Sequence, residues 1–479
     1  MRIEETDVCV IGSGAGGSVV AFEAALAGRK TLIIERGPYV RSQDMSHDEL
    51  KMVARLYKDG GLQLNTSMDM FILQGSCVGG STVLANYAMF RIPEPVLDEW
   101  EKLGTVFDRA ALQRSHEKIE RVLGVVPAIT ANMSSGSRLL MKGAQAIGLD
   151  VRPMMKALGG CTGCGGCNIG CIWDHKRSAL TTHIAWAETH GARVLADTTV
   201  DKIDWHRGKV RGLQAFTGPD QEPLYIRAKS VVVAGGAIGS PGLLLKSKIR
   251  GNVGHRVSFN AGAGLVSEFA KPVDTFDGDQ MSIYIKCDGY NIEPVHNPPV
   301  ASSLMVPGWF SQHGELMRKF RHLTYGGPLV ATDAVGRVVH SPFFGHEETR
   351  FRMPDHNLQT LKHGLKNQAR AMFAAGAERV ILPTHIFQTI ERPEDVDQID
   401  TAFHSTREIG MGTSHPQGGN AWTEDPEISV LDQDFAVRGF DNLFVCDASI
   451  FPSGVRVNPI ESIMAVADYA APRILARAG

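Results

Sequence analysis

The feature that most constrains the fold is a glycine-rich turn directly after the first apolar run of the chain. Residues 7–11 (DVCVI) predict a short buried strand, and the turn that follows contains Gly12, Gly14 and Gly17. An alanine-rich apolar run predicts a helix over 19–27, and residues 31–35 (TLIIE) predict a second strand that ends at Glu35. Strand, G-x-G-x-x-G turn, helix and strand in this order are typical of a dinucleotide-binding unit.

Each residue of this turn has a physical role in holding a dinucleotide. Gly12 permits the tight turn, Gly14 lets a pyrophosphate approach the backbone, and Gly17 lets the helix pack closely on the strand. The helix N-terminus offers unpaired N–H groups to the phosphates, and Glu35 is placed to accept hydrogen bonds from a ribose. Because the turn lies near the start of the chain, with the rest of the protein built around it, we expect FAD; an NAD-dependent dehydrogenase is the alternative.

Later segments indicate that the dinucleotide domain is discontinuous. Residues 75–82 form a second glycine-rich loop, and short β-rich runs over 200–205, 210–216, 224–228 and 231–234 predict a small antiparallel meander. A strand over 443–447 and an alanine-rich helix over 462–471 close the chain. We predict an α/β (α+β) protein with a Rossmann-like FAD-binding domain over 1–100, 190–265 and 425–479, an insert over 101–189, and a substrate domain over 266–424.

Composition and charge exclude several classes of partner. The formal net charge is −3, and 43% of residues are apolar, which is typical of a globular protein and gives no basic stripe for nucleic acid. No run approaches the roughly 20 apolar residues of a membrane span. The N-terminus carries no secretory or twin-arginine pattern, so we expect a cytoplasmic protein; export together with a partner subunit would instead place it in the periplasm.

Four segments, in order along the chain, resemble the glucose–methanol–choline (GMC) oxidoreductases, which oxidise alcohols with FAD. They are the N-terminal turn, the loop over 78–86, the run over 233–241, and the pair of segments over 412–416 and 447–459. The resemblance implies a Rossmann-like FAD domain joined to a substrate domain built on an antiparallel sheet. It also implies contacts with FAD from Gly12, Gly14, Gly17, Glu35, Gly79, Gly80, Ser81, Asn86, Ala234, Gly235, Asp447 and Pro459.

The same resemblance identifies His415 as the catalytic base and Asn458 as the residue that hydrogen-bonds the substrate oxygen. Alcohol oxidation removes the hydroxyl proton and passes hydride to flavin N5, and histidine suits the first task because its pKa lies near neutrality. Asn458 and Pro459 also favour a helix N-terminus, whose positive dipole suits the N1/O2 edge of reduced flavin. A buried structural histidine and an asparagine that only caps the helix are the alternatives.

A cysteine run is the second unusual feature. Cys161, Cys164, Cys167 and Cys171 form C-x2-C-x2-C-x3-C among glycines, a spacing typical of iron–sulfur ligands, although Ile172 stands where proline is usual. Either Cys171 completes a four-iron cluster (4Fe-4S), or the other three thiolates hold a three-iron cluster (3Fe-4S). Zinc is a weaker alternative, and free thiols or disulfides that pack a loop are another.

These observations predict an enzyme that oxidises the CH–OH group of a small-molecule alcohol and passes electrons to an external acceptor, such as a small subunit or a cytochrome, through the iron–sulfur cluster. An O2-using alcohol or sterol oxidase without a cluster is one alternative, and a non-catalytic flavin electron-relay subunit is another. Apolar residues over 309–323 recur near helical spacing with basic residues between them. We favour a core-facing helix there over a membrane-surface helix or an apolar lid.

Overall fold

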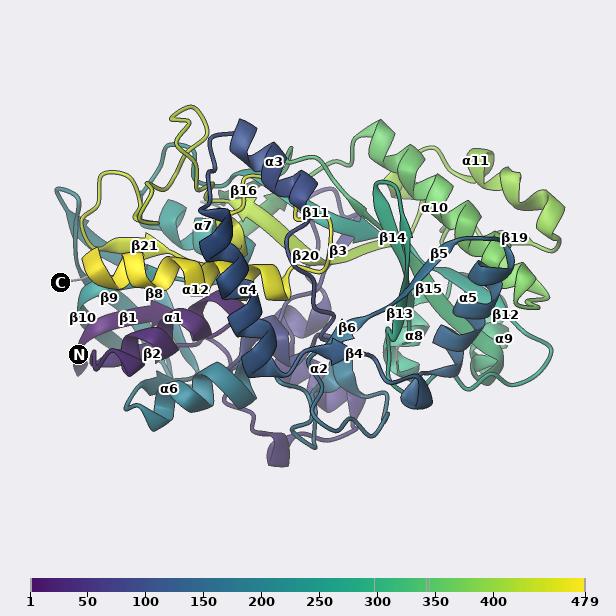
Figure 1. Cartoon of the computed structure of the whole chain (residues 1–479), viewed down its shortest axis with the longest axis horizontal. Helices are drawn as coiled ribbons and strands as arrows, with labels where there is room; N and C mark the ends of the chain where they lie inside the picture. Colours follow the sequence, from purple (N-terminus) through teal and green to yellow (C-terminus); the bar gives the residue numbers. More distant parts are fainter. Residues whose placement is uncertain (1, 297, 342, 344, 478–479) are drawn as a thin grey trace.

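The computed structural model describes residues 2–296, 298–341, 343 and 345–477. The molecule is elongated, with one sheet near each end of its long axis (Figure 1). Both chain termini lie at the end that holds the first sheet, beside β1 and β10 (Figure 1). Each sheet has its own large cluster of buried apolar residues. The α/β fold class predicted from the sequence is confirmed.

The first sheet is parallel at its centre and antiparallel along one side. Its order is β7-β2-β1-β10-β9-β8, with β21 also pairing β10. The pairs that β1 makes with β2 and β10 are parallel, and so are β2 with β7 and β10 with β21. The strands are β1 (Arg2–Ile11), β2 (Thr31–Ile34), β7 (Arg193–Leu195), β8 (Thr198–His206), β9 (Lys209–Thr217), β10 (Glu222–Val233) and β21 (Leu443–Val445).

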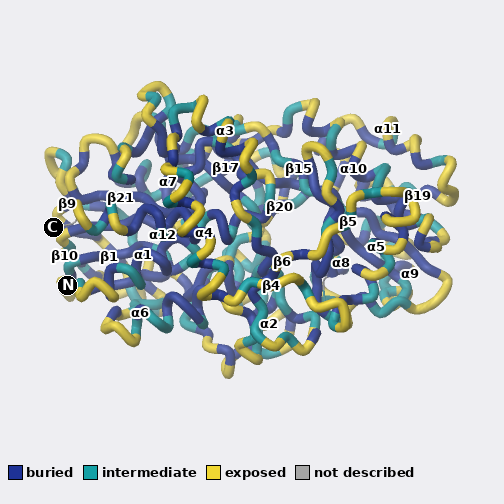
Figure 2. The backbone as a smooth tube through the Cα atoms, viewed as in Figure 1, coloured by how far each residue is buried: buried dark blue, intermediate teal, exposed yellow. Residues whose placement is uncertain are grey.

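Helices α1 (Ala15–Leu26) and α12 (Ile460–Arg477) pack against each other beside this sheet, and Figure 2 shows buried backbone through β1, β10 and α12. Parallel strands covered in this way are buried on both faces, which explains their continuous β-branched runs. The expected meander is present as β8, β9 and β10. Its last two predicted runs form the single strand β10, because Lys229 and Ser230 between them do not break an extended chain.

The second sheet is largely antiparallel, as predicted, with the order β19-β18-β12-β15-β11-β20-β3. Strand β14 pairs β15 and β13, and β13 pairs β5. Its strands are β3 (Met70–Ile72), β5 (Asp150–Pro153), β11 (His255–Gly262), β12 (Leu265–Glu268), β13 (Ile283–Cys287), β14 (Tyr290–Val295), β15 (Leu323–Ala331), β18 (Arg379–Ile381), β19 (Thr389–Ile390) and β20 (Met411–Gly419). Strands β3, β5 and β11 come from outside 266–424, and the domain boundaries stay a prediction.

Helix α10 (Asp355–Ala374) packs on the second sheet and on α5 (Ser135–Ala146), as Figure 1 shows at the far end from the termini. Among the described helices, none combines the length and apolar character needed to cross a membrane. The remaining elements are α2 (Glu49–Leu56), α3 (Glu94–Lys102), α4 (Arg109–Leu123), α6 (Ala185–Thr189), α7 (Gly236–Lys246), α8 (Pro299–Met305), α9 (Phe310–Arg318), α11 (Ile399–Ala402), the pair β4 (Val126–Pro127) and β6 (Met155–Lys156), and the pair β16 (Arg337–His340) and β17 (Glu347–Arg350).

Candidate active site

A large cavity is lined by residues of both sheets. It has a volume of about 1330 Å³ and runs from the glycine turn after β1 to strands β14, β15 and β20 of the second sheet. Most of the residues predicted to bind FAD line it, and so do His415 and Asn458. Those lining residues are Gly12, Gly14, Glu35, Gly80, Ser81, Asn86, Ala234, Gly235, Asp447 and Pro459. The predicted residues Gly17 and Gly79 do not line the cavity; they support the loops behind its wall.

The glycine turn has the geometry that a pyrophosphate site requires. Gly12 has a φ of +105°, and a Cβ there would lie 2.2 Å from the carbonyl oxygen of Ala234. A Cβ on Gly17 would lie 2.1 Å from the carbonyl oxygen of Gly12. At Gly14 a Cβ would meet no heavy atom within 4 Å, so this position is open to the cavity. Gly12 and Gly17 are therefore required by packing, whereas Gly14 leaves space for a ligand at the start of α1.

Glu35, directly after β2, is held rigidly at the cavity wall. Its Oε2 accepts hydrogen bonds from Ser13 Oγ at 2.7 Å and from Ser13 N at 3.2 Å, and its Oε1 accepts one from Gly37 N at 3.0 Å. Burial raises the pKa of this carboxyl, while the bonds from Ser13 and Gly37 oppose the shift. Oε2 already accepts two hydrogen bonds, whereas Oε1 accepts one and has a further lone pair, through which the side chain can still accept a hydroxyl group.

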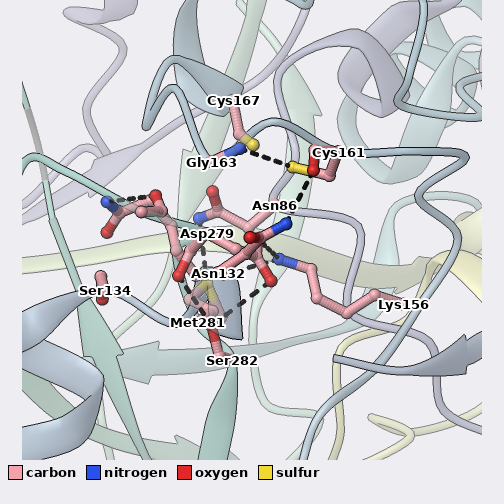
Figure 3. Close-up of polar contacts among 12 residues, drawn as sticks. Asn86, Asn132, Ser134, Lys156, Cys161, Gly163, Cys167, Asp279, Met281 and Ser282 are labelled. Carbon is pink, nitrogen blue, oxygen red and sulfur yellow. Dashed lines mark hydrogen bonds and ion pairs between the residues drawn. The ribbon is translucent and has the colours of Figure 1, made fainter. Parts of the chain in front are cut away.

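The other cofactor candidates tie separate loops to the same wall. Asp447 accepts a hydrogen bond from Gly236 N at 2.8 Å, which joins the segment after β21 to the turn after β10. Gly79 N donates to Ser13 Oγ at 2.9 Å, which joins the second glycine loop to the first. Asn86 lies beside Met281, with its Oδ1 buried and without a partner, as Figure 3 shows among its neighbours. The three loops predicted from the sequence are thus brought together.

His415 and Asn458 both line the cavity, and a short chain of contacts through Asn260 connects their segments. His415 lies on β20 and pairs with Asn260 of β11. Asn260 Nδ2 donates to the carbonyl oxygen of Val457 at 2.6 Å, which fixes the residue before Asn458. The His415 ring lines the cavity, and its buried Nδ1 has no hydrogen-bond partner. Burial lowers the pKa of His415 to about 4, so the imidazole is neutral near pH 7.

Glu293 is a candidate functional residue that the sequence analysis missed. It lies on β14, is only 1% exposed, and lines the cavity. Asn458 Nδ2 donates to its Oε2 at 3.4 Å, whereas its Oε1 is buried without a partner. Burial raises the pKa of Glu293 to about 7, and the bond from Asn458 opposes the shift. The available signal was an acidic residue between Ile292 and Pro294 in a strand that is otherwise uncharged. Burying an unpaired carboxyl destabilises a fold, so a protein that keeps one often uses it at a functional site.

The compartment around these three polar side chains is otherwise largely apolar. Residues from several distant segments form its wall. Residues 307–308 before α9 and residues 326–328 of β15 contribute glycine backbone and proline rings. The apolar lining includes Ala263, Met281, Val295, Val306, Pro328, Leu329 and Met411. A ligand beside these residues would meet hydrocarbon as well as the hydrogen-bonding groups of His415, Asn458 and Glu293.

The four cysteines of the run do not line the cavity, although Asn168 and Ile169 between them do, and they do not form a metal site. Among the residues that the structure describes, no group of three or more His, Cys, Asp or Glu side chains could hold a metal ion. All four cysteines of the run are free thiols: Cys164 is exposed, while Cys161, Cys167 and Cys171 are partly buried. Burial raises the pKa of Cys161 to about 11 and that of Cys167 in the same direction, so both are neutral thiols in the folded chain.

Two buried lysines hold the cysteine loop in place. Lys156 Nζ forms an ion pair with Asp279 Oδ1 at 2.6 Å, drawn in Figure 3 beside the hydrogen bond from Gly163 N to Cys161 Sγ. Lys176 Nζ donates to the carbonyl oxygen of Cys167 at 2.7 Å. The geometry does not support the predicted iron–sulfur cluster or zinc, and it fits the alternative of thiols within a packed loop.

The family models that match this chain agree with one another. Two family models described as "GMC oxidoreductase" match residues 53–261 and 340–467, and one described as "FAD binding domain" matches residues 7–47. An uncharacterized GMC-type oxidoreductase of Mycobacterium tuberculosis is 29% identical over 99% of this chain and 76% of its own length. A long-chain-alcohol oxidase of Arabidopsis thaliana is 25% identical over 98% of this chain and 67% of its own length.

A cholesterol oxidase of Acinetobacter baumannii is 25% identical over 98% of this chain and 94% of its own length. Among solved structures, pyridoxine 4-oxidase of Mesorbium loti superposes with a TM-score of 0.69 at 18% identity, covering 98% of this chain and 99% of the other. A formate oxidase of Aspergillus oryzae superposes with a TM-score of 0.74 at 13% identity, covering 99% of each chain. At these identities the structural matches establish a shared fold.

Proposed function

This chain belongs to the GMC oxidoreductase family and is an FAD-binding enzyme, and from that premise we propose that it oxidises the CH–OH group of an apolar alcohol. The observation that carries the proposal is that His415, Asn458 and Glu293 line the same largely apolar cavity, with Asn458 hydrogen-bonded to Glu293. That cavity also includes the glycine turn after β1. A hydroxyl group would be held by these polar side chains while its hydrocarbon contacts the apolar lining.

The cavity residues around the glycine turn after β1 fit FAD. The open position at Gly14 suits the pyrophosphate, and the buried carboxylate of Glu35 suits a ribose hydroxyl. Helix α12 begins at Ile460, directly after Asn458 and Pro459, so its positive dipole end faces the cavity. When bound, FAD supplies the hydride acceptor at N5 of its ring.

His415 accepts the proton of the substrate hydroxyl in this proposal. The imidazole is neutral near pH 7 because burial holds its pKa down, so a ring nitrogen is free to take a proton. Nδ1 has no partner in the protein, which leaves the ring without a fixed tautomer until substrate binds. A base of this kind is needed because hydride cannot leave the carbinol carbon while the oxygen keeps its proton.

Asn458 holds the substrate oxygen, and Glu293 positions Asn458. One N–H of the Asn458 amide donates to Glu293 Oε2, and the second N–H remains for the substrate oxygen. With a pKa of about 7, Glu293 changes charge in the neutral range. A carboxylate accepts the Asn458 N–H more strongly than the neutral acid does, so we expect Asn458 to be held more firmly and the oxidation to become faster as Glu293 ionises.

Molecular oxygen is the electron acceptor that we favour. An acceptor reached through an iron–sulfur cluster requires a metal site, which the described cysteines do not form. Two of the relatives with assigned activities are named oxidases, of long-chain alcohols and of cholesterol. We therefore propose an oxidase that yields hydrogen peroxide, with a dehydrogenase that uses a separate acceptor protein as the second candidate.

Anaerobic mixing of the purified holoenzyme with decanol, cholesterol or D-glucose tests this function. We expect decanol or cholesterol to bleach the oxidised-flavin absorbance and D-glucose to leave it unchanged. Admission of O2 should then restore the absorbance and yield hydrogen peroxide. In His415→Ala the flavin should remain bound and no longer bleach. Bleaching by D-glucose alone, or an unchanged rate in His415→Ala, would contradict the proposal.

A further inference from the structure

The mouth of the cavity is surrounded by exposed apolar side chains. Phe310 is 94% exposed, Leu304 73%, Trp309 68% and Leu62 62%, and all of them line the cavity. We call this group the apolar rim; its members are Leu62, Val300, Leu304, Met305, Trp309 and Phe310. None of these side chains carries a charge. A soluble protein rarely exposes contiguous apolar surface of this kind without a binding role.

Specific contacts hold the rim in an exposed position. The carboxylate of Glu49 on α2 accepts the N–H groups of Val300 at 2.8 Å and Ala301 at 2.6 Å, which fixes the start of α8. Trp309 Nε1 donates to the carbonyl oxygen of His385 at 3.2 Å. Phe310 has a φ of +49°, a left-handed conformation that is unfavourable for a residue with a side chain. Strain of this kind persists where the surrounding structure enforces it, often at binding sites.

The expected core-facing helix is present for Leu316 and Met317, whereas Trp309 and Phe310 depart from it. Helix α9 begins at Phe310 and buries only Leu316, which packs with Val266 and Tyr325. Trp309 and Phe310, at its start, point away from that core, since both remain exposed. The amphipathic pattern therefore divides into a short buried face and an exposed aromatic pair at the cavity mouth.

The position of the rim around an opening limits what can cover it. A protein partner or a second copy of this chain seated there would close the mouth through which substrate must pass. A fluid lipid surface would cover the same side chains and leave the opening connected to a phase in which apolar alcohols dissolve. Tryptophan is also favoured at lipid–water boundaries, because its ring is apolar and its N–H is polar.

We propose that the apolar rim inserts into the surface of a lipid bilayer, so that the cavity mouth opens onto the lipid phase and receives an apolar alcohol from it. The delivery step rests on the proposed function, whereas the docking step does not. Because the inserting side chains are uncharged, the hydrophobic effect drives the docking, and binding should depend little on salt.

Flotation of the FAD-loaded enzyme with phosphatidylcholine vesicles, without any alcohol present, tests the docking alone. The wild-type enzyme should float with the vesicles at low and at high salt. The double variant Trp309→Ser/Phe310→Ser should bind at least about tenfold more weakly, because it removes two large inserting side chains. Trp173→Ser is the matched control: Trp173 is 56% exposed, lies outside the cavity lining, and should keep full binding.

Tryptophan fluorescence in vesicles made with brominated lipids tests the orientation. Quenching should occur in the wild-type enzyme, because bromine atoms in the lipid chains would lie near Trp309. Trp309→Phe should still float with vesicles, because it keeps an apolar ring, but should lose most of the quenching. Trp173→Phe should keep both properties.

Three outcomes would overturn the docking proposal. The first is a wild-type enzyme that does not float with vesicles, and the second is equal weakening by the Trp173→Ser control. The third is a wild-type dimer in solution that Trp309→Ser/Phe310→Ser converts to a monomer, which would assign the rim to a second copy of the chain. If vesicles bind as expected while no alcohol reduces the flavin, the docking stands and the proposed function fails.

Discussion

Replacing Glu293 by glutamine should change stability and catalysis in opposite directions. Glutamine keeps the shape and the hydrogen bond from Asn458 but cannot ionise. Burial shifts the pKa of Glu293 from 4.5 to about 7, and the side chain is only 1% exposed, so solvent hardly screens the effect. At about 1.4 kcal/mol per pKa unit, ionising this carboxyl in the folded protein costs roughly 3 kcal/mol more than in the unfolded chain.

The sign of the pH dependence follows from proton linkage. The folded protein keeps the proton of Glu293 up to a pKa of about 7, whereas the unfolded chain releases it near 4.5. The stabilisation is therefore complete below the unfolded pKa and is lost as the pH rises through the folded pKa. Glu293→Gln lacks this loss, so its stability relative to wild type should increase by roughly 2–3 kcal/mol between about pH 5 and pH 8.

Catalysis should show the reverse effect. The rate of flavin reduction by decanol, measured anaerobically by stopped flow, should rise in the wild type as the pH passes through about 7. In Glu293→Gln this rise should disappear and the rate above pH 7 should fall about tenfold or more, because a neutral amide holds Asn458 less strongly than a carboxylate does. Urea unfolding at both pH values measures the stability difference.

Glu461→Gln is the control, since it changes another buried glutamate that does not line the cavity and pairs with His116 at 2.8 Å. It should keep the pH-dependent rise in rate. If Glu293→Gln kept the same rise and the same pH dependence of stability as wild type, the role assigned to Glu293 would be refuted.

Three further predictions concern the base, the cofactor site and the cysteine loop. His415→Ala should lower the rate of flavin reduction by about 10²–10⁴-fold with FAD content unchanged, measured by stopped flow and absorbance. Gly14→Val should fold normally but purify with less FAD, because its side chain would enter the open cavity. Gly12→Ala should instead lower the melting temperature, because its Cβ would lie 2.2 Å from a carbonyl oxygen. Calorimetry and the flavin content of the purified proteins distinguish the two effects. Iron and acid-labile sulfide in the anaerobically purified enzyme should each be far below one equivalent per chain, and Cys164→Ser should keep full activity. Stoichiometric iron would show instead that the cysteine run binds a cluster.

The dinucleotide-binding half of the fold could be predicted because its signals are local. The strand, the glycine turn and the helix that starts at Ala15 lie within a few residues of one another, so spacing alone defines them. The same holds for β21 and α12 at the other end of the chain. Helix α1 begins four residues earlier than its apolar run, because backbone groups after Gly14 start the first turn without needing apolar side chains.

The part of the site that we propose binds the alcohol could not be predicted in the same way, because its residues are distant in the sequence. Glu293 meets Asn458 only because β14 joins the second sheet beside β15, a pairing that no local pattern specifies. The apolar compartment likewise combines Met281, Val306 and Met411 from three separate segments. Conversely, the cysteine spacing predicted a metal site from local sequence alone, whereas ligand geometry depends on how the loop folds around Lys156 and Lys176.

The most direct test of the account is the anaerobic reduction of the bound flavin by decanol, compared in the wild-type enzyme and in His415→Ala. The account predicts that decanol bleaches the oxidised flavin of the wild type and leaves that of His415→Ala oxidised, although both proteins bind FAD. A wild-type flavin that decanol and cholesterol leave oxidised, or a His415→Ala flavin that is reduced at the wild-type rate, would contradict it.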